Sequence, residues 1–251
     1  MFTLHFPVKL PEENSFFDNG QYPVPPLPGG LSVGCVSNEK APLVLRISGF
    51  AVEQDAFDFC PTLRIALRLA ALGSDHSLSP SDAQPVKSNQ KHFDGSVPTV
   101  TLTSTAALPY HASASVHTGL HISVLSNLIG TSLSQGSPGK IVANPRLALA
   151  LELHADCQFA GEWNAQFIVL MTALEVLVPQ STKKGKRGAV IGLVKTAIAK
   201  LSHPDPKSVG KTLDALYVTR NDLIHEAKPV TDGDLQSLKQ IVRDTLRGLI
   251  I

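Results

Sequence analysis

A chain of 251 residues, 43% of them hydrophobic, has enough apolar material for the core of one large domain or two small ones. No apolar run reaches the ~18–20 residues that span a bilayer, and the first residues lack the basic and apolar regions of an export signal. We therefore expect a soluble cytoplasmic protein that makes no contact with a membrane. Three widely spaced cysteines, Cys35, Cys60 and Cys157, argue against a disulfide framework and against a structural zinc site.

The net charge of +1 hides a weak asymmetry along the chain. Residues 145–251 carry 14 basic and 11 acidic side chains, whereas residues 1–144 carry 8 basic and 10 acidic ones. A slightly basic C-terminal part is compatible with a partner that bears phosphate groups. The excess is too small to require such a partner.

The first part of the chain predicts a mixture of strands and one helix. Apolar stretches at residues 3–10, 43–47 and 97–103 are typical of strands, and residues 55–72 carry an apolar stripe at helical spacing. Pro61 lies inside this helix and marks an alternative start for it. Residues 74–96 are polar and contain prolines, as expected of a loop. We expect residues 1–104 to form a small α+β unit.

Residues 105–144 are expected to connect two parts of the protein. A helix that begins near Pro109 is the favoured interpretation of a serine- and histidine-rich stretch, and residues 130–140 resemble a Gly/Ser loop. His117 and His121 have the spacing of metal ligands on a helix, but no third ligand is placed to complete a site. We therefore interpret them as polar surface residues and predict neither a metal nor another cofactor.

The last part of the chain is strongly helical. Five helices are predicted at residues 145–159, 162–178, 189–201, 206–227 and 231–250. The second of these, which begins near Trp163, is apolar nearly all round, so it should form the buried centre of a bundle. The expected fold is α+β overall, with an all-helical unit over residues 145–251.

Glu175 is the residue on this central helix that needs an explanation. A buried carboxylate is costly unless it is paired, and Arg220 on a later helix points toward the apolar side. Pairing of these two side chains is one interpretation. The other is that Glu175 reaches the surface at the end of its helix, and the sequence leaves both open.

Residues 220–225, Arg-Asn-Asp-Leu-Ile-His, hold the strongest functional signal. At about 100° of rotation per residue, Asn221 and His225 share one face of a helix and could meet the same ligand. Arg220 points elsewhere, toward the apolar arc that contains Tyr217 and Ile224. Its guanidinium cannot lose its charge, so it needs an acidic partner or a bound anion there.

This run resembles the Arg-x4-His signature of the HEPN superfamily, small helical bundles that include metal-independent endoribonucleases. Asn221 is the polar residue that the signature prefers after the arginine. Upstream, residues 148–151 and 167–177 resemble the paired helices of the ApeA-like HEPN group, and residues 173–177 read Ala-Leu-Glu-Val-Leu, as its Ala-Leu-Glu-x-Leu element does. The resemblance covers roughly residues 145–251.

The resemblance implies a mechanism that needs no cofactor. His225 would be the acid and base, Arg220 would stabilise the phosphate or organise the site, and Asn221 would position the substrate. In the family two protomers bring their motifs together, so a homodimer is implied. RNA would be cut by attack of its own 2′-hydroxyl, which is compatible with a defence or toxin-like role.

A short basic run near the motif has two interpretations. Lys183, Lys184, Lys186 and Arg187 are either a solvated connector or a loop that contacts RNA phosphates without reading the base sequence.

A different class of function stays open beside the nuclease. The bundle could be a non-catalytic module that binds RNA or a nucleotide, acts as a sensor, or forms dimers. In this alternative the three motif residues hydrogen-bond across helices and carry out no chemistry. A regulatory protein partner is compatible with both functions. A third interpretation is a structural domain in which the motif is accidental. The enzyme is the favoured hypothesis.

Overall fold

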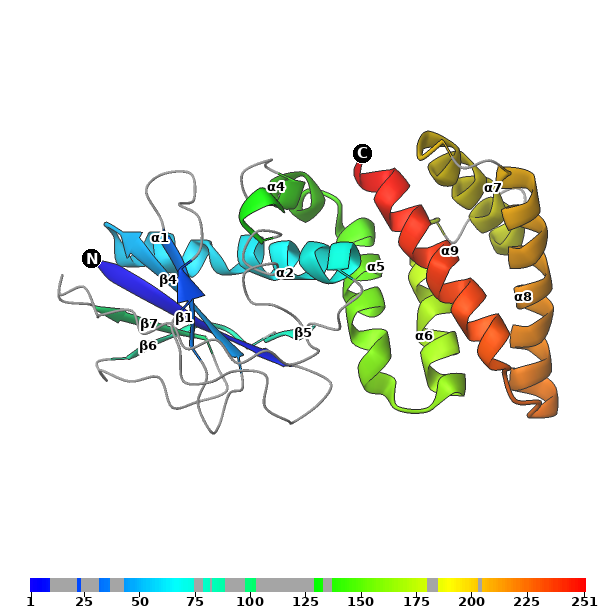
Figure 1. Ribbon diagram of the computed structural model, residues 1–251, viewed down its shortest axis with the longest axis horizontal. Helices are drawn as coiled ribbons and strands as arrows, with labels where there is room; N and C mark the ends of the chain where they lie inside the picture. The colour runs from blue at the N-terminus through cyan, green and yellow to red at the C-terminus, as the bar shows by residue number, and fades with distance from the viewer. Residues whose placement is uncertain are drawn as a thin grey trace. The chain divides into compact units, whose positions relative to one another are not determined.

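The computed structural model describes most of the chain in two compact units. The described residues are 1–9, 22–23, 32–36, 43–74, 79–81, 83–88, 98–102, 129–132, 137–179, 185–202 and 205–251. One unit is Met1–Val142, and the other is Ala143–Ile251. The first unit contains a sheet and helices, and the described part of the second is helical (Figure 1). The expected α+β class is therefore confirmed.

The first unit is built on one sheet. Its strands are β1 (Phe2–Lys9), β2 (Tyr22–Pro23), β3 (Ser32–Val36), β4 (Leu43–Phe50), β5 (Ser79–Pro80), β6 (Val86–Ser88) and β7 (Thr99–Leu102). Their order is β2-β3-β4-β1-β7-β6, with β5 paired to β1. The described pairs are antiparallel except β6 with β7. The strands predicted at residues 3–10, 43–47 and 97–103 are confirmed, whereas the loop predicted at residues 74–96 was wrong where it contains β5 and β6.

Alternation along β1 places its apolar residues on the covered face of the sheet. Leu4, Phe6 and Val8 are buried, and β1 pairs with β4 so that Leu4 lies opposite Ile47 and Phe6 opposite Leu45. Successive side chains of a strand point to opposite faces, so residues two apart share the core.

Two helices pack against this sheet and supply much of the core of the first unit. They are α1 (Glu53–Asp58) and α2 (Cys60–Ser74), separated at Phe59. The single helix predicted over residues 55–72 is therefore broken, and Pro61 lies in the first turn of α2, where the missing N–H costs least. The buried stripe of α2 is made by Leu63, Ala66, Leu67 and Ala70.

Residues 130–140 are not the loop that their glycine and serine content suggested. Residues 129–132 are helical, and α4 (Ser137–Val142) follows. Ile129 and Ile141 are buried, and these apolar anchors favour helical segments over an exposed loop. The helix predicted from Pro109, with the histidines at positions 111, 117 and 121, lies outside the described residues.

The second unit consists of helices that lie side by side (Figure 1). They are α5 (Pro145–Asp156), the short 3₁₀ helix η2 (Cys157–Ala160), α6 (Trp163–Val176), α7 (Gly185–Lys200), α8 (Pro206–Glu226) and α9 (Asp232–Ile250). The all-helical unit predicted over residues 145–251 is confirmed for its described residues. None of the described helices combines the length and the apolar character that crossing a membrane requires.

Side-chain caps define where three of these helices begin. The side-chain oxygens of Asn144, Asp205 and Thr231 accept hydrogen bonds from backbone N–H groups in the first turns of α5, α8 and α9. A cap satisfies donors that have no partner inside the helix. Proline follows Asn144 and Asp205 directly, at a position that suits its fixed φ angle.

The core of the second unit centres on α6, where Phe167, Leu170, Met171 and Leu174 are fully buried. The sequence suggested that this helix is buried nearly all round, but part of its surface is exposed. Trp163 is 52% exposed because it is the first residue of α6 and lies at its end. The hydrogen bond from the Val230 backbone N–H to Asn164 Oδ1 (3.0 Å) joins this end of α6 to the turn after α8.

Candidate active site on helix α8

The motif residues lie where α8 extends past its neighbour α7. Arg187 near the start of α7 contacts Asp214, and Lys195 lies beside Gly210, so the two helices are antiparallel. These two contacts set the register of the helix pair. In this register the part of α8 after Tyr217 extends beyond Gly185, the first residue of α7.

This overhang exposes the end of the motif. Asn221 and His225 are exposed, and neither side chain hydrogen-bonds to another described residue. Ile224 was expected on the packed arc but is 51% exposed, because α7 does not reach this part of α8. Ala227 then ends the helix with a left-handed backbone, φ 53°.

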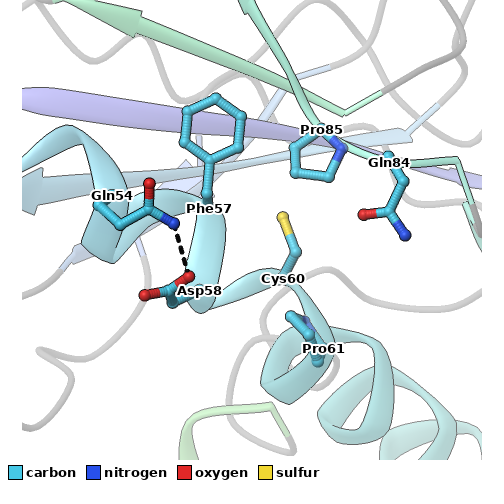
Figure 2. Close-up of a pocket in the computed structure, with 7 residues that line it drawn as sticks. All are labelled: Gln54, Phe57, Asp58, Cys60, Pro61, Gln84 and Pro85. Carbon is cyan, nitrogen blue, oxygen red and sulfur yellow. Dashed lines mark hydrogen bonds between the residues drawn. The ribbon is translucent and has the colours of Figure 1, made fainter.

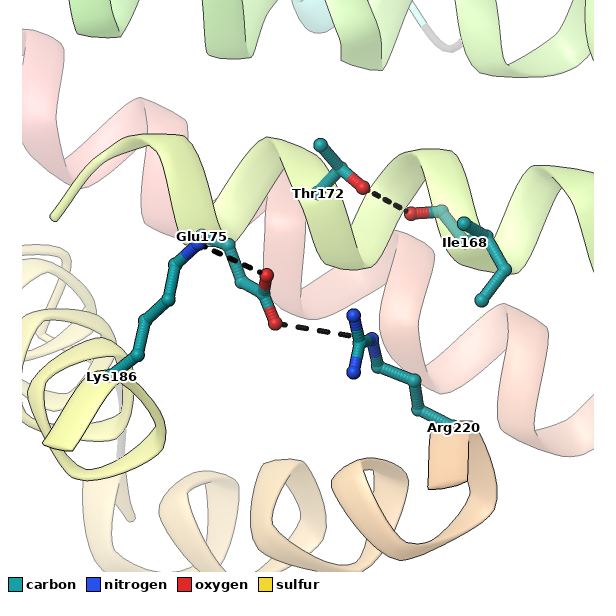
Figure 3. A network of polar contacts seen from close by, with 5 residues as sticks. All are labelled: Ile168, Thr172, Glu175, Lys186 and Arg220. Atoms are coloured by element: carbon teal, nitrogen blue, oxygen red, sulfur yellow. Dashed lines mark hydrogen bonds and ion pairs between the residues drawn. The ribbon is translucent and has the colours of Figure 1, made fainter. Parts of the chain in front are cut away.

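Arg220 points back into the bundle, toward α6. Its Nε atom lies 3.9 Å from Oε1 of Glu175, and the side chains are 30% and 14% exposed, respectively (Figure 3). Of the two interpretations that the sequence left open, the structure supports the pairing of Glu175 with Arg220. Glu175 does not reach out to the surface at the end of its helix, since its side chain is only 14% exposed.

Lys186 is the second cation on Glu175. Its Nζ atom lies 3.3 Å from Oε2, on the carboxylate oxygen that Arg220 does not face (Figure 3). Helix α7 begins at Gly185, so Lys186 lies in its first turn rather than in the predicted basic loop. The predicted RNA contacts Lys183 and Lys184 lie outside the described residues.

Arg187 is also engaged within the bundle. Its Nε donates a 2.7 Å hydrogen bond to Asp214 Oδ1, and its Nη2 donates one of 2.9 Å to the backbone oxygen of Asp214. The guanidinium carbon lies 5.5 Å from the centre of the Tyr217 ring, within the range of a cation–π contact. These contacts fix the start of α7 against α8, so Lys186 and Arg187 are not cations of a mobile loop.

Tyr217 is the neighbour of this site that the sequence did not reveal. It is 5% exposed, and its Oη atom is buried. Among the described residues, no partner meets both the distance and the angle of a hydrogen bond to this atom. Burial raises the pKa of the phenol well above its usual value, and the Glu175 carboxylate raises it further. The hydroxyl therefore keeps its proton next to Glu175. Its position three residues before Arg220 was the available signal, since a buried tyrosine hydroxyl usually needs a partner.

A cavity in the first unit offers different chemistry. It measures about 500 Å³ and is lined by Gln54, Phe57, Asp58, Cys60, Pro61, Gln84 and Pro85 (Figure 2). Gln54 Nε2 donates a 2.8 Å hydrogen bond to Asp58 Oδ1, so that carboxylate already has a partner. Burial raises the pKa of the Cys60 thiol to about 11, which keeps it protonated and unreactive at neutral pH. We therefore place the candidate active site on α8.

Metal ligation is not indicated around α8. Within the described ranges, no three side chains of histidine, cysteine, aspartate or glutamate gather as a metal site would require. What α8 offers is an exposed imidazole, an exposed amide and a guanidinium near a carboxylate.

Comparison with known proteins does not assign the chain to a family. No protein-family model matches it, and neither a curated protein nor a solved structure does.

Proposed function

We propose that the protein is a metal-independent endoribonuclease of the HEPN type, with Arg220, Asn221 and His225 as its site residues. The observation that carries this proposal is that the three motif residues of α8 point in two directions. His225 and Asn221 are open to a substrate, whereas Arg220 lies beside Glu175 at the edge of the bundle. The resemblance of residues 145–251 to ApeA-like HEPN domains supports the same activity.

The chemistry needs only these groups and the RNA. The 2′-oxygen attacks the adjacent phosphorus, its proton passes to a base, and the bond from phosphorus to the 5′-oxygen breaks as an acid protonates the leaving oxygen. An exposed histidine can fill either role near neutral pH. Arg220 would stabilise the charge that grows on the phosphate oxygens, and Asn221 would hold the substrate. The products are a 2′,3′-cyclic phosphate and a 5′-hydroxyl.

The complete site would need two copies of the chain. Base and acid act on opposite sides of the phosphorus, and one copy contributes a single motif histidine. Asn221, Ile224 and His225 together give α8 an exposed surface with polar and apolar character, which suits a two-fold contact. We propose a homodimer in which the overhang of α8 faces its symmetry mate.

One observation favours a second function. Arg220 already has an acidic partner inside the bundle, as expected of a residue that stabilises a fold. A non-catalytic module that binds RNA or a nucleotide, or acts as a sensor or dimerisation unit, would use Asn221 and His225 as surface contacts only.

End-group analysis of cleaved RNA separates the two functions. Purified protein is incubated with mixed single-stranded RNAs in EDTA, and the new ends are identified by mass spectrometry. The enzyme predicts 2′,3′-cyclic phosphates paired with 5′-hydroxyls. RNA that is bound but stays intact would favour the module, and fragments with 5′-phosphates would contradict the proposed chemistry.

A further inference from the structure

Glu175 receives one cation from each of two helices, at unequal distances. Lys186 Nζ on α7 is 3.3 Å from Oε2, and Arg220 Nε on α8 is 3.9 Å from Oε1 (Figure 3). A hydrogen bond from nitrogen to oxygen spans about 2.7–3.2 Å, so Lys186 lies just beyond that range and Arg220 lies well beyond it, attracted to the carboxylate without being hydrogen-bonded to it. The lysine ammonium is therefore the nearer of the two cations.

This arrangement leaves Arg220 with unused donors. A guanidinium carries five N–H groups, and the Arg220 side chain hydrogen-bonds to none of the described residues. A planar fork of this kind matches both a carboxylate and a phosphate. If Glu175 had no other cation, its charge would draw the guanidinium into a hydrogen-bonded pair, and those donors would be lost to a substrate.

We propose that Lys186 is a positioning residue for Arg220: by engaging Glu175 it prevents the carboxylate from capturing the guanidinium and keeps the N–H groups of Arg220 available to an RNA phosphate. The use of those groups rests on the proposed function, but the effect of Lys186 on Arg220 does not. Lys186 thereby differs from a residue that touches RNA itself.

The first turn of α7 is held well enough for this role. The neighbouring Arg187 is bound to the side chain and backbone of Asp214 and stacks on Tyr217. Lys186 therefore projects from a fixed point, and Glu175 is held between α7 and α8.

The effect on Arg220 can be measured without RNA. In Lys186→Met, NMR of the arginine side chains should show the Arg220 Nε–H signal shifted downfield and exchanging with water at least about threefold more slowly than in the parent protein. Arg220→Lys assigns the signal. Lys200→Met is the matched control, because Lys200 is an exposed lysine in the last turn of the same helix. Glu175→Gln combined with Lys186→Met should abolish the shift. An Arg220 signal that is unchanged in Lys186→Met would overturn the proposal.

Kinetics with a fluorogenic RNA test the consequence for cleavage. Lys186→Met should lower kcat about tenfold with little change in KM, Lys186→Arg should restore most of the rate, and adding Glu175→Gln to Lys186→Met should recover activity. If Lys186 contacted a phosphate directly, KM would rise instead and the salt dependence of RNA binding would fall by about one unit of slope. That result would contradict positioning. If the parent protein does not cleave RNA, the proposed nuclease activity is refuted. The effect of Lys186 on Arg220 is decided separately, by the NMR result.

Discussion

Glu175 on α6 and Arg220 on α8 face each other across 3.9 Å, and Lys186 on α7 contacts the same carboxylate at 3.3 Å. One carboxylate therefore connects three helices. Because Lys186 stays in place when Arg220 is removed, Glu175 does not become an unpaired charge.

We expect Arg220→Ala to lower the free energy of unfolding by about 1 kcal/mol, in keeping with a partly exposed pair. Arg220→Ala combined with Lys186→Met removes both cations and should cost more than the two single changes together. Urea unfolding of the four proteins gives the comparison. A loss of about 3–5 kcal/mol in Arg220→Ala alone, the cost of breaking a fully buried pair, would contradict the sharing of Glu175.

Gly248 marks a close approach of α9 to α7. A Cβ atom at this position would overlap the backbone carbonyl of Ala197, and a backbone group cannot move aside cheaply. We expect Gly248→Ala to lower the unfolding free energy by at least about 2 kcal/mol through overpacking. In Gly192→Ala on α7 the new Cβ meets nothing within 4 Å, so that variant should gain up to about 1 kcal/mol from helix propensity. Equal thermal shifts in the two variants would contradict the close contact.

His5 makes the first unit sensitive to acid. Burial, aided by the Arg46 guanidinium on the paired strand, lowers the pKa of His5 to about 4. Between pH 6.5 and 4 the unfolded chain thus binds more protons at this residue than the folded one, so stability falls as the pH falls through this window. The loss amounts to roughly 3 kcal/mol at most. Urea unfolding at pH 7 and pH 4.5 should show a smaller decrease in His5→Gln than in the parent protein. Identical decreases would exclude His5 as the cause.

Substitutions at the exposed motif residues Asn221 and His225 distinguish a nuclease site from a purely structural motif. Both are exposed on the overhang of α8, so Asn221→Ala should change the unfolding free energy by no more than about 0.5 kcal/mol. If Asn221 positions RNA, the same variant should lose about tenfold or more in kcat/KM. Unchanged kinetics would remove Asn221 from the site. Asp222→Asn, which changes a side chain on the same turn that is paired with Lys228, is the control.

Local signals made the helices of the second unit predictable. Asp205 with the proline after it and Thr231 with Asp234 are caps that can be read directly from the sequence, and α8 and α9 begin where these signals lie. The approach of Arg220 to Glu175 was one of two interpretations open from the sequence, because both a carboxylate and a guanidinium on apolar helix faces need a partner.

Features that depend on a distant partner were not predictable. The sequence predicts a basic loop around Lys186 and Arg187. Cations are unfavourable in the first turn of a helix, but Glu175 and Asp214 from other helices offset that cost here. The exposure of Trp163 follows from where the bundle ends, and periodicity carries no information about that. The short strands β5 and β6 are stabilised by pairing with β1 and β7 and have little pattern of their own.

Cleavage of single-stranded RNA in EDTA by the parent protein and by His225→Ala tests the central claim most directly. Because His225 is exposed and makes no hydrogen bond to a described residue, the variant should melt at the same temperature as the parent protein. The account predicts that the parent protein releases 2′,3′-cyclic phosphate ends and that His225→Ala loses this activity by a factor of at least about 100. Cleavage at the parent rate by a folded His225→Ala protein would contradict it.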